Sequence, residues 1–360
     1  MSERTLKNHI RNNVLFAIWL LVFGTQFAYA AVEREDLIFI PVVFHIVYSV
    51  DEENISDEQI LSQIVSLNDD FRSRNIDLLG VGDDFKASIG DGGIEFVYAN
   101  KIIDFPVDPI IRVESDKKVF FNSDLFESSK GGSNPIEENR ILNVWVANLS
   151  EGLLGFYDQK GIAIDFKNFG TNGTAESPHD LGRTLTHEVG HFFSLKHLWG
   201  IGGCDSDDGV NDTPTQFDEI LGCDLESISC GSRDMTQNFM NTSLDHCLLF
   251  FTKGQIEKMR NYIVENLPEM ILEKNEIVLE VNEGLRTVNF YPNPANEGLI
   301  YFEGIPSNVN FLILFSLGGR LIGKYPIAGR SVQLNDIEKG VYILKLEGDN
   351  YYKTSKMIVE

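Results

Sequence analysis

The chain has 360 residues, of which 43% are hydrophobic, and a formal net charge of −24. Because domains usually contain about 100–200 residues, this length predicts two folded units and a targeting segment. The acidic charge excludes nucleic acid and anionic membrane as main partners, because a negative surface repels both.

The first thirty residues have the pattern of a signal peptide. Basic residues stand near the start, an apolar stretch runs from Val14 to Phe23, and Ala28-Tyr29-Ala30 offers small residues for cleavage. A transmembrane anchor is the alternative, but a membrane span needs about 20 apolar residues and this stretch is shorter. We therefore predict a signal peptide over residues 1–30, export of the chain, and no membrane span in the mature protein.

Residues 31–275 combine strand and helix patterns. Ile38 to Tyr48 is β-branched and aromatic on both faces, which predicts a central strand. A helix should follow from the capping-box residues Ser56 and Gln59, and another should begin at Thr252. Further strands are expected over 93–100, 141–149 and 161–166, and a helix over 181–194. This part should be a mixed α/β unit.

All four cysteines lie in one stretch that is rich in Asp, Gly and Ser and has little periodicity. In an exported chain, Cys204, Cys223, Cys230 and Cys247 should form disulfides, and three pairings are open. A tetrathiolate zinc site is the alternative, but no C-x-x-C spacing supports it. We expect loops held by disulfides between residues 200 and 247.

After a linker at residues 276–286, the pattern changes to short alternating strands separated by turn residues. This predicts a small all-β sandwich of roughly seven strands over residues 287–360. The segment contains no cysteine and no histidine, so nothing in it is expected to be catalytic.

The segment HEVGHFFSLKH, from His187 to His197, carries the chemistry. Two imidazoles four residues apart on a helix share one face and suit a tetrahedral zinc. His187 and His191 would be two ligands, and His197 would be the third after the chain turns back. Glu188 lies beside them and can act on an attacking water without binding the metal. A helix with ordinary exposed or satisfied histidines is the alternative.

This segment resembles the zinc signature of the metzincin metalloproteases, and HEVGHFFSLKHLWG is similar to the pappalysin family, particularly its bacterial cytophagalysin-like members. Blocks such as IPVVFHIVY, LNVWVANL and QNFMNTSLDHCLLFF extend the likeness over about residues 38–270. The resemblance implies a metzincin-like α+β catalytic domain: a mixed twisted sheet, an active-site helix and an irregular, disulfide-held lower part.

The resemblance also implies roles for several residues outside the zinc signature. Met240 would be the methionine of the turn beneath the zinc. Asp245 would line the pocket after the scissile bond and favour Arg or Lys there, although a solvated loop aspartate is the alternative. The disulfides would be Cys204–Cys230 and Cys223–Cys247. Clustered carboxylates suit calcium, so the loop should bind Ca²⁺ through Asp205, Asp207, Asp208 and Asp212, unless it is an acidic loop without calcium.

Two residues depart from the family pattern. Ser194 stands where the signature has glycine, which is favoured because the turn takes positive φ. Serine should adopt it at a cost of about 1 kcal/mol. Thr242 stands where relatives usually carry a tyrosine, and its hydroxyl is too short to replace that phenol.

The C-terminal segment has FYPNPANEG near its start, LFSLGGRLI in the middle and KTSKMIVE at its end. It resembles the sorting domain of type IX secretion cargo, which implies the type IX export machinery as a partner. A carbohydrate-binding or adhesive sandwich is the alternative.

We therefore predict a secreted zinc endopeptidase that acts on protein or peptide substrates. A catalytically weak or inactive metzincin-fold binding module is one alternative, suggested by Ser194 and Thr242. A metal-dependent amidase that acts on cell-wall peptide is another.

Overall fold

The structure is a computed structural model that describes residues 37–359, apart from 103–107, 273–288 and short gaps at 296–297, 304, 306–308, 317–320, 328, 335–336 and 349–350. The predicted signal peptide and linker lie outside the described residues. In the part that the structure describes, no helix is long and apolar enough to cross a membrane.

Strand β1 (Ile38–Tyr48) forms the centre of a six-stranded sheet, as its two apolar faces predict. The order is β2-β1-β4-β6-β5, and β3 also pairs with β1. All these pairs are parallel except the one between β5 and β6. The other strands are β2 (Ile94–Tyr98), β3 (Ile110–Glu114), β4 (Leu142–Ala147), β5 (Gly155–Asp158) and β6 (Gly161–Asp165). The sequence analysis did not predict β3 or β5.

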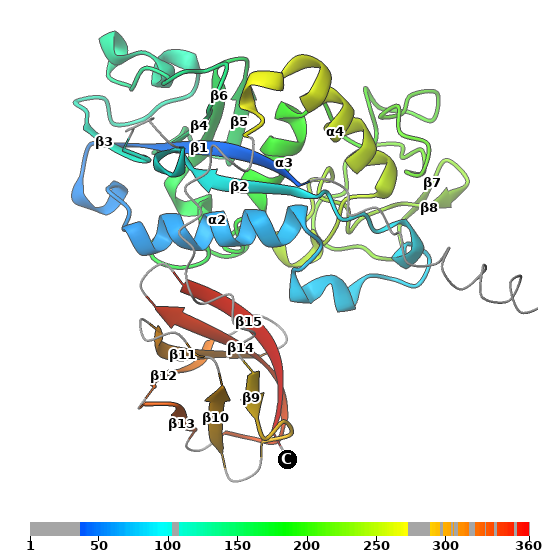
Figure 1. Cartoon of the computed structure of the whole chain (residues 1–360). Coiled ribbons are helices and arrows are strands. Elements are labelled where there is room, and N and C mark those ends of the chain that lie inside the picture. Colours follow the sequence, from blue (N-terminus) through cyan, green and yellow to red (C-terminus); the bar gives the residue numbers. More distant parts are fainter. Residues whose placement is uncertain are drawn as a thin grey trace, which may run out of the picture. The chain divides into compact units, whose positions relative to one another are not determined.

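Helices α2 (Asp57–Phe71) and α3 (Arg183–Phe192) pack against one face of this sheet (Figure 1). Their apolar stripes enter the core cluster that contains alternate residues of β1, such as Ile40 and Val42. Val43 and Val47 of β1 face the other side and belong to separate clusters. The period-2 alternation of the strand therefore divides its side chains between two cores.

Ser56 caps α2 by accepting a hydrogen bond from the Gln59 amide, 3.2 Å away. The Gln59 side-chain oxygen does not complete a capping box with the Ser56 amide, because it accepts from the Thr174 amide at 3.0 Å instead. Helix α4 (Lys253–Asn266) has the complete box between Thr252 and Gln255, as predicted.

Between residues 200 and 247 the chain is mainly irregular, as expected. Its regular elements are the short hairpin of β7 (Ile228–Ser229) and β8 (Ser232–Arg233) and the 3-10 turn η9 (Asp245–Cys247). Disulfides Cys204–Cys230 and Cys223–Cys247 cross-link this segment.

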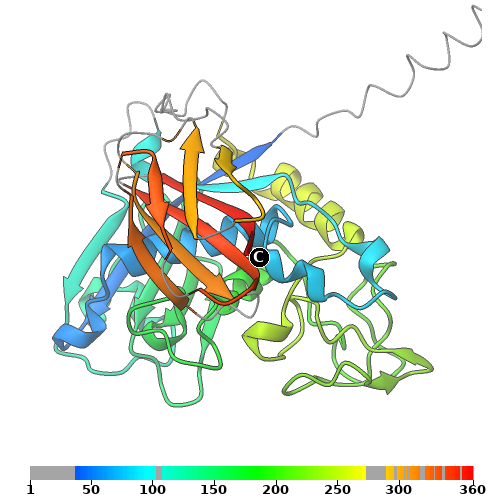
Figure 2. The same ribbon diagram turned by 90° about the horizontal axis from the view of Figure 1, so that it is seen from below.

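The C-terminal domain consists of two antiparallel sheets in the orders β13-β10-β9 and β12-β11-β14-β15, drawn from orange to red in Figure 2. The strands are β9 (Asn289–Tyr291), β10 (Leu299–Glu303), β11 (Val309–Ser316), β12 (Leu321–Pro326), β13 (Ser331–Gln333), β14 (Gly340–Gly348) and β15 (Tyr351–Val359). They enclose a core of their own, with Ile300, Leu312 and Leu344 at its centre. The predicted fold class is confirmed for both domains.

Candidate active site

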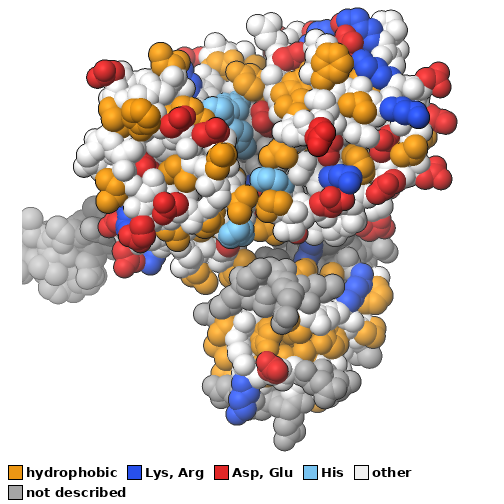
Figure 3. All heavy atoms as spheres, turned by 180° about the vertical axis from the view of Figure 1, so that it is seen from behind, with side chains coloured by type: hydrophobic (Ala, Val, Ile, Leu, Met, Phe, Trp, Pro, Cys, Tyr) orange, Lys and Arg blue, Asp and Glu red, His pale blue; other side chains and the backbone are white. Residues whose placement is uncertain are grey.

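Helix α3 places His187 and His191 one turn apart, and the chain after it returns His197 to the same point. The Nε2 atoms of the three rings lie 3.0–3.1 Å from one another. In the described part of the chain, the other group of three metal-binding residue types is Cys223, His246 and Cys247, whose cysteines are joined in a disulfide. Histidine side chains are visible in a hollow on the face in Figure 3.

The outer nitrogens of two rings fix the way these rings point. Nδ1 of His187 lies 2.7 Å from the Phe239 carbonyl oxygen, and Nδ1 of His191 lies 3.0 Å from the Leu195 carbonyl oxygen. A carbonyl only accepts, so each Nδ1 must carry the proton and each Nε2 must present a lone pair. Burial lowers the pKa of His187 to about 3 and that of His197 to about 4, which also favours neutral rings.

This donor set fits a zinc ion. Lone pairs that converge at these distances repel one another unless they share a cation. An ion about 2.0–2.1 Å from each nitrogen can lie over the centre of the triangle that they form. With three protein ligands, such an ion would keep a coordination position for water or substrate, as a hydrolytic site requires.

Glu188 lies beside His187 on the same helix and is 9% exposed. Burial raises the pKa of its carboxyl to about 8. A divalent cation held by the neighbouring histidines would lower this pKa again, because an opposite charge favours the ionised form. The carboxyl therefore suits a group that accepts a proton and later releases it.

Met240 packs against helix α3 at Gly190, through a contact that depends on glycine. A Cβ atom at Gly190 would lie 2.5 Å from the Met240 sulfur, so only glycine leaves room for the thioether. Met240 is fully buried, and the Asn238 side chain binds its amide at 2.9 Å. The preceding residue, Phe239, supplies the carbonyl that orients His187.

Ser194 makes the turn that brings His197 back. Its φ is 74°, the left-handed conformation expected from the family pattern. The Ser194 and Leu195 amides donate to the carbonyls of His191 and Gly190, at 2.9 Å each, which is the Schellman arrangement of a helix end. Serine therefore forms the turn without loss of its hydrogen bonds.

Thr242 does not direct its hydroxyl to the three histidines. The hydroxyl lies 3.3 Å from a carboxylate oxygen of Glu219 at the surface. This position therefore offers no free donor near the reacting centre.

Two aromatic rings that the sequence analysis did not single out flank the three histidines. Tyr157 of β5 stacks on His191 with ring centroids 5.5 Å apart and an angle of 20°. Trp199 stacks on His197 at 4.3 Å and 15°. A ring stack between residues that are distant in the chain leaves no pattern in a single sequence.

Arg183, in the first turn of α3, is a further residue that sequence reasoning missed. Its buried guanidinium pairs with Asp70 of α2 and with Asp77, whose Oδ2 lies 2.6 Å away. It also lies 5.3 Å from the centre of the Phe239 ring. These contacts fix the start of α3 against α2 and against the residue that orients His187.

Asp245 is buried, and its carboxylate is bound on several sides. Oδ2 accepts from the amides of Leu181 and Arg183 at 2.9 and 3.3 Å, and Oδ1 lies 3.3 Å from Nδ1 of His179. Asp245 therefore holds the entry to α3.

The four aspartates expected at a calcium site do not form a group of three or more close ligands in the described part of the chain. Asp212 caps α4 through Thr252 and the Gly254 amide, and Asp207 accepts from the Gly209 amide. Asp208 is buried, and its Oδ2 has no hydrogen-bond partner. Asp205 lies at the exposed disulfide loop.

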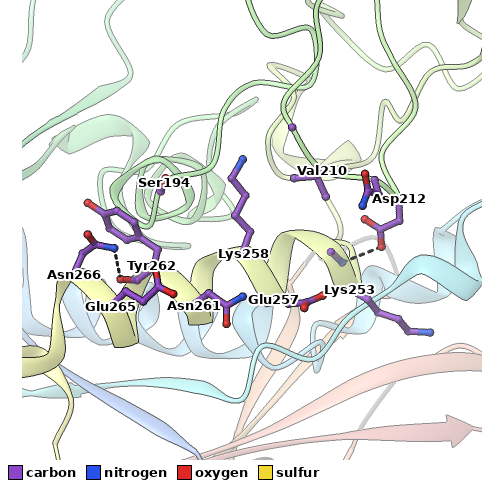
Figure 4. Close-up of a pocket in the computed structure, with 13 residues that line it drawn as sticks. Ser194, Val210, Asp212, Lys253, Glu257, Lys258, Asn261, Tyr262, Glu265 and Asn266 are labelled. Carbon is purple, nitrogen blue, oxygen red and sulfur yellow. Dashed lines mark hydrogen bonds between the residues drawn. The ribbon is translucent and has the colours of Figure 1, made fainter.

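A polar pocket of about 740 Å³ lies between Ser194, the loop at 209–212 and α4. Figure 4 shows Asp212 bonded to the start of α4 and Lys258 extended across this pocket. Glu188 and the three histidines are not among its lining residues, so it is separate from the candidate active site.

Comparisons with known proteins agree with this geometry. The family model described as pregnancy-associated plasma protein-A matches residues 138–264, and the model described as secretion system C-terminal sorting domain matches residues 289–360. An extracellular metalloprotease of Arthroderma benhamiae is 30% identical over 233 residues, which are 60% of this chain and 69% of the relative. One from Arthroderma gypseum is 32% identical over 235 residues and covers the same shares.

Solved structures that resemble this chain are also those of a metalloprotease-like fold, represented by mirolysin. Mature mirolysin of Tannerella forsythia in complex with a cleaved peptide superposes with a TM-score of 0.63 and 37% identity, covering 68% of this chain and 99% of that one. Mirolysin in complex with a compound matches equally well. This chain therefore belongs to the pappalysin family of secreted zinc metalloendopeptidases and carries a type IX secretion sorting domain at its C-terminus.

Proposed function

We propose that this endopeptidase uses His187, His191 and His197 as its zinc ligands and Glu188 as its general base. The observation that carries the proposal is the convergence of three Nε2 atoms within 3.0–3.1 Å of one another, next to a buried carboxyl on the same helix.

The substrate would bind along the edge of the sheet. Strand β5 pairs only with β6 in the described part of the chain, so its other edge is available for an extended peptide. Packing of β5 on α3 is close, because a Cβ at Gly155 would lie 3.1 Å from a Thr184 methyl group. A peptide on this edge would therefore pass beside the histidines.

The proton transfers belong to Glu188. Zinc, when bound, polarises the scissile carbonyl and makes a water easier to ionise. Glu188 removes a proton from the attacking water as the new carbon–oxygen bond forms. It then delivers that proton to the nitrogen of the leaving amine as the peptide bond breaks.

Replacement of Glu188 tests this assignment. Glu188→Ala should lower kcat on denatured protein by at least about 10³-fold, because the base is lost, while bound zinc stays near one per chain. Glu188→Asp, with a shorter carboxylate, is the matched control and should retain part of the activity. Cleavage by Glu188→Ala at the wild-type rate would refute the role of Glu188. An inactive wild type with zinc bound would favour the binding module.

A cleavage assay with two substrates tests the substrate class. Wild-type enzyme incubated with gelatin and with peptidoglycan should release fragments from gelatin only. Release from peptidoglycan alone would favour the cell-wall amidase.

A preference for Arg or Lys after the scissile bond would act through Asp245. Its support is a negative charge held in place beside the entry to α3 by the Leu181 and Arg183 amides. In peptides that differ only at this position, the kcat/KM ratio of Arg to Leu should exceed 10 and fall in Asp245→Asn. The ratio is used because the absolute rate would also report a disturbed helix.

Calcium binding at the acidic loop is also a proposal. It is supported by Asp208, a buried carboxylate with one oxygen that has no partner, since oxygen ligands suit Ca²⁺. The other ligands would be loop carbonyls and water rather than Asp212, which caps α4. Calcium should raise the Tm of the wild type and not that of Asp208→Asn. A wild-type Tm that does not respond to calcium would contradict the proposal.

A further inference from the structure

Peptide hydrolysis by the proposed route develops negative charge on the scissile carbonyl oxygen, and a positioned donor for that charge is worth about 10²–10³ in kcat. The zinc ligands cannot supply this donor, because the Nδ1 protons of His187 and His191 are used by carbonyls. Thr242 cannot supply it either, since its hydroxyl lies against Glu219. A side chain that borders the histidines and has a free hydrogen-bond donor is therefore a candidate for this role.

Tyr157 is such a side chain. Its ring lies almost parallel to that of His191, with centroids 5.5 Å apart. The residue is 47% exposed, so solvent and a bound ligand can reach it. In the part of the chain that the structure describes, its hydroxyl makes no hydrogen bond and is free to donate to a ligand.

The position of Tyr157 is fixed by backbone elements. It lies on β5, opposite Ile162 of β6, at the edge along which the substrate would bind. Strand β5 is held close to α3 at Gly155, where a side chain would contact Thr184. The edge strand, the ring stack and the active-site helix therefore pack together, and a donor held by such packing is more effective than a mobile one.

We propose that Tyr157 is a catalytic residue whose hydroxyl donates a hydrogen bond to the scissile carbonyl oxygen as it becomes an oxyanion. The inference rests on the proposed function. The ring of Tyr157 would steady His191 by stacking, and the hydroxyl would act on the substrate. These two contributions can be separated, because Tyr157→Phe keeps the ring and removes only the hydroxyl.

The test compares Tyr157→Phe and Tyr157→Ala with wild type and with the control Tyr262→Phe, which removes a phenol from α4. Tyr157→Phe should lower kcat by about 10–100-fold with little change in KM, and its zinc affinity in chelator competition should equal that of wild type. Tyr157→Ala should lose at least as much kcat and should also bind zinc less tightly. The control should match wild type in both measurements.

A binding measurement gives a readout without turnover. A phosphinic peptide carries a tetrahedral oxyanion in place of the scissile carbonyl, so calorimetry with zinc-loaded protein should show a Kd for Tyr157→Phe weakened by about the factor lost in kcat. An unchanged kcat and Kd in Tyr157→Phe would overturn the inference. A loss seen in Trp199→Phe instead would also overturn it and identify the indole as the donor. In both cases, an active wild type and an inactive Glu188→Ala leave the proposed function intact.

Discussion

His45 and His187 are both held in low-dielectric surroundings. Their hydrogen-bond partners differ, and this decides which of the two has a ring nitrogen free to bind a metal. His45 of β1 is fully buried between Ser133 and Asn143, which lie 2.8 and 2.9 Å from its two ring nitrogens. The Asn143 oxygen only accepts, so Nε2 carries the proton and Nδ1 accepts from the Ser133 hydroxyl. His45 therefore has no free nitrogen for a metal, whereas His187 has one.

This network predicts a pH dependence of stability. Burial lowers the pKa of His45 to about 4, compared with about 6.5 in an unfolded chain. Between these values the unfolded state binds a proton and the folded state does not, so the free energy of unfolding falls as pH falls from 6.5 to 4. The contribution of His45 should reach about 3 kcal/mol.

Denaturant unfolding at several pH values checks this expectation. His45→Gln should be less stable at neutral pH but should show a shallower decline with acid. His246→Gln removes an exposed histidine and should follow the wild-type curve. Parallel curves for wild type and His45→Gln would contradict the prediction, whatever their absolute stability.

Ser194, at the end of α3, shows how the structure of an element depends on single backbone positions. The left-handed turn brings His197 back to the other two histidines, and serine adopts it at a conformational cost. Ser194→Gly should therefore raise the free energy of unfolding by about 0.5–1 kcal/mol and the Tm by about 2–4 °C.

The matched control is Ser194→Ala, which keeps a Cβ atom and should bring no gain. Thermal unfolding of the zinc-loaded proteins measures both changes. Equal stabilisation by glycine and alanine would mean that the gain comes from the hydroxyl rather than from the backbone.

The elements that could be predicted from the sequence are those with a long, regular period. Strand β1 and helices α2, α3 and α4 have such periods, and their caps at Ser56 and Thr252 were recognisable. Strand β5 was missed because four residues, including Gly155, are too few for an alternation. The ion pair of Arg183 with Asp77 was missed because it joins residues 106 positions apart.

The two disulfides close loops of similar length in the irregular segment, with sequence separations of 26 and 24. Their contributions to stability should therefore be similar, at about 3 kcal/mol each in the chain-entropy model. Their effects on activity should differ, because Cys247 lies in the same 3-10 turn as Asp245, which holds the entry to α3. Replacement of Cys223 and Cys247 by serine should lower kcat/KM more than replacement of Cys204 and Cys230.

Unfolding curves and peptide cleavage, measured on both double variants in one buffer, decide this comparison. An equal loss of kcat/KM in the two variants would contradict the link through Asp245.

At the scale of the whole molecule, the hydrophobic clusters of the described chain fall into two groups along the sequence, one before and one after residues 273–288. The larger core ends with Ile271 and the smaller one begins with Phe290. No cluster of described residues contains members from both parts, which supports the proposed division into a catalytic domain at 31–275 and a sorting domain at 287–360. The proposed linker lies between them, outside the described residues.

Removal of residues 287–360 should therefore leave catalysis intact and abolish export. The shortened enzyme keeps every residue of the larger core, so its Tm and its kcat/KM on gelatin, measured after purification from cells, should stay within about twofold of the full chain's values. In a host with a type IX system, the full chain should reach the medium or the cell surface. The shortened chain should accumulate in the periplasm. The control is a full chain with Glu188→Ala, which should be exported normally without cleaving gelatin. Loss of activity in the shortened enzyme would show that the catalytic domain needs the second core to fold.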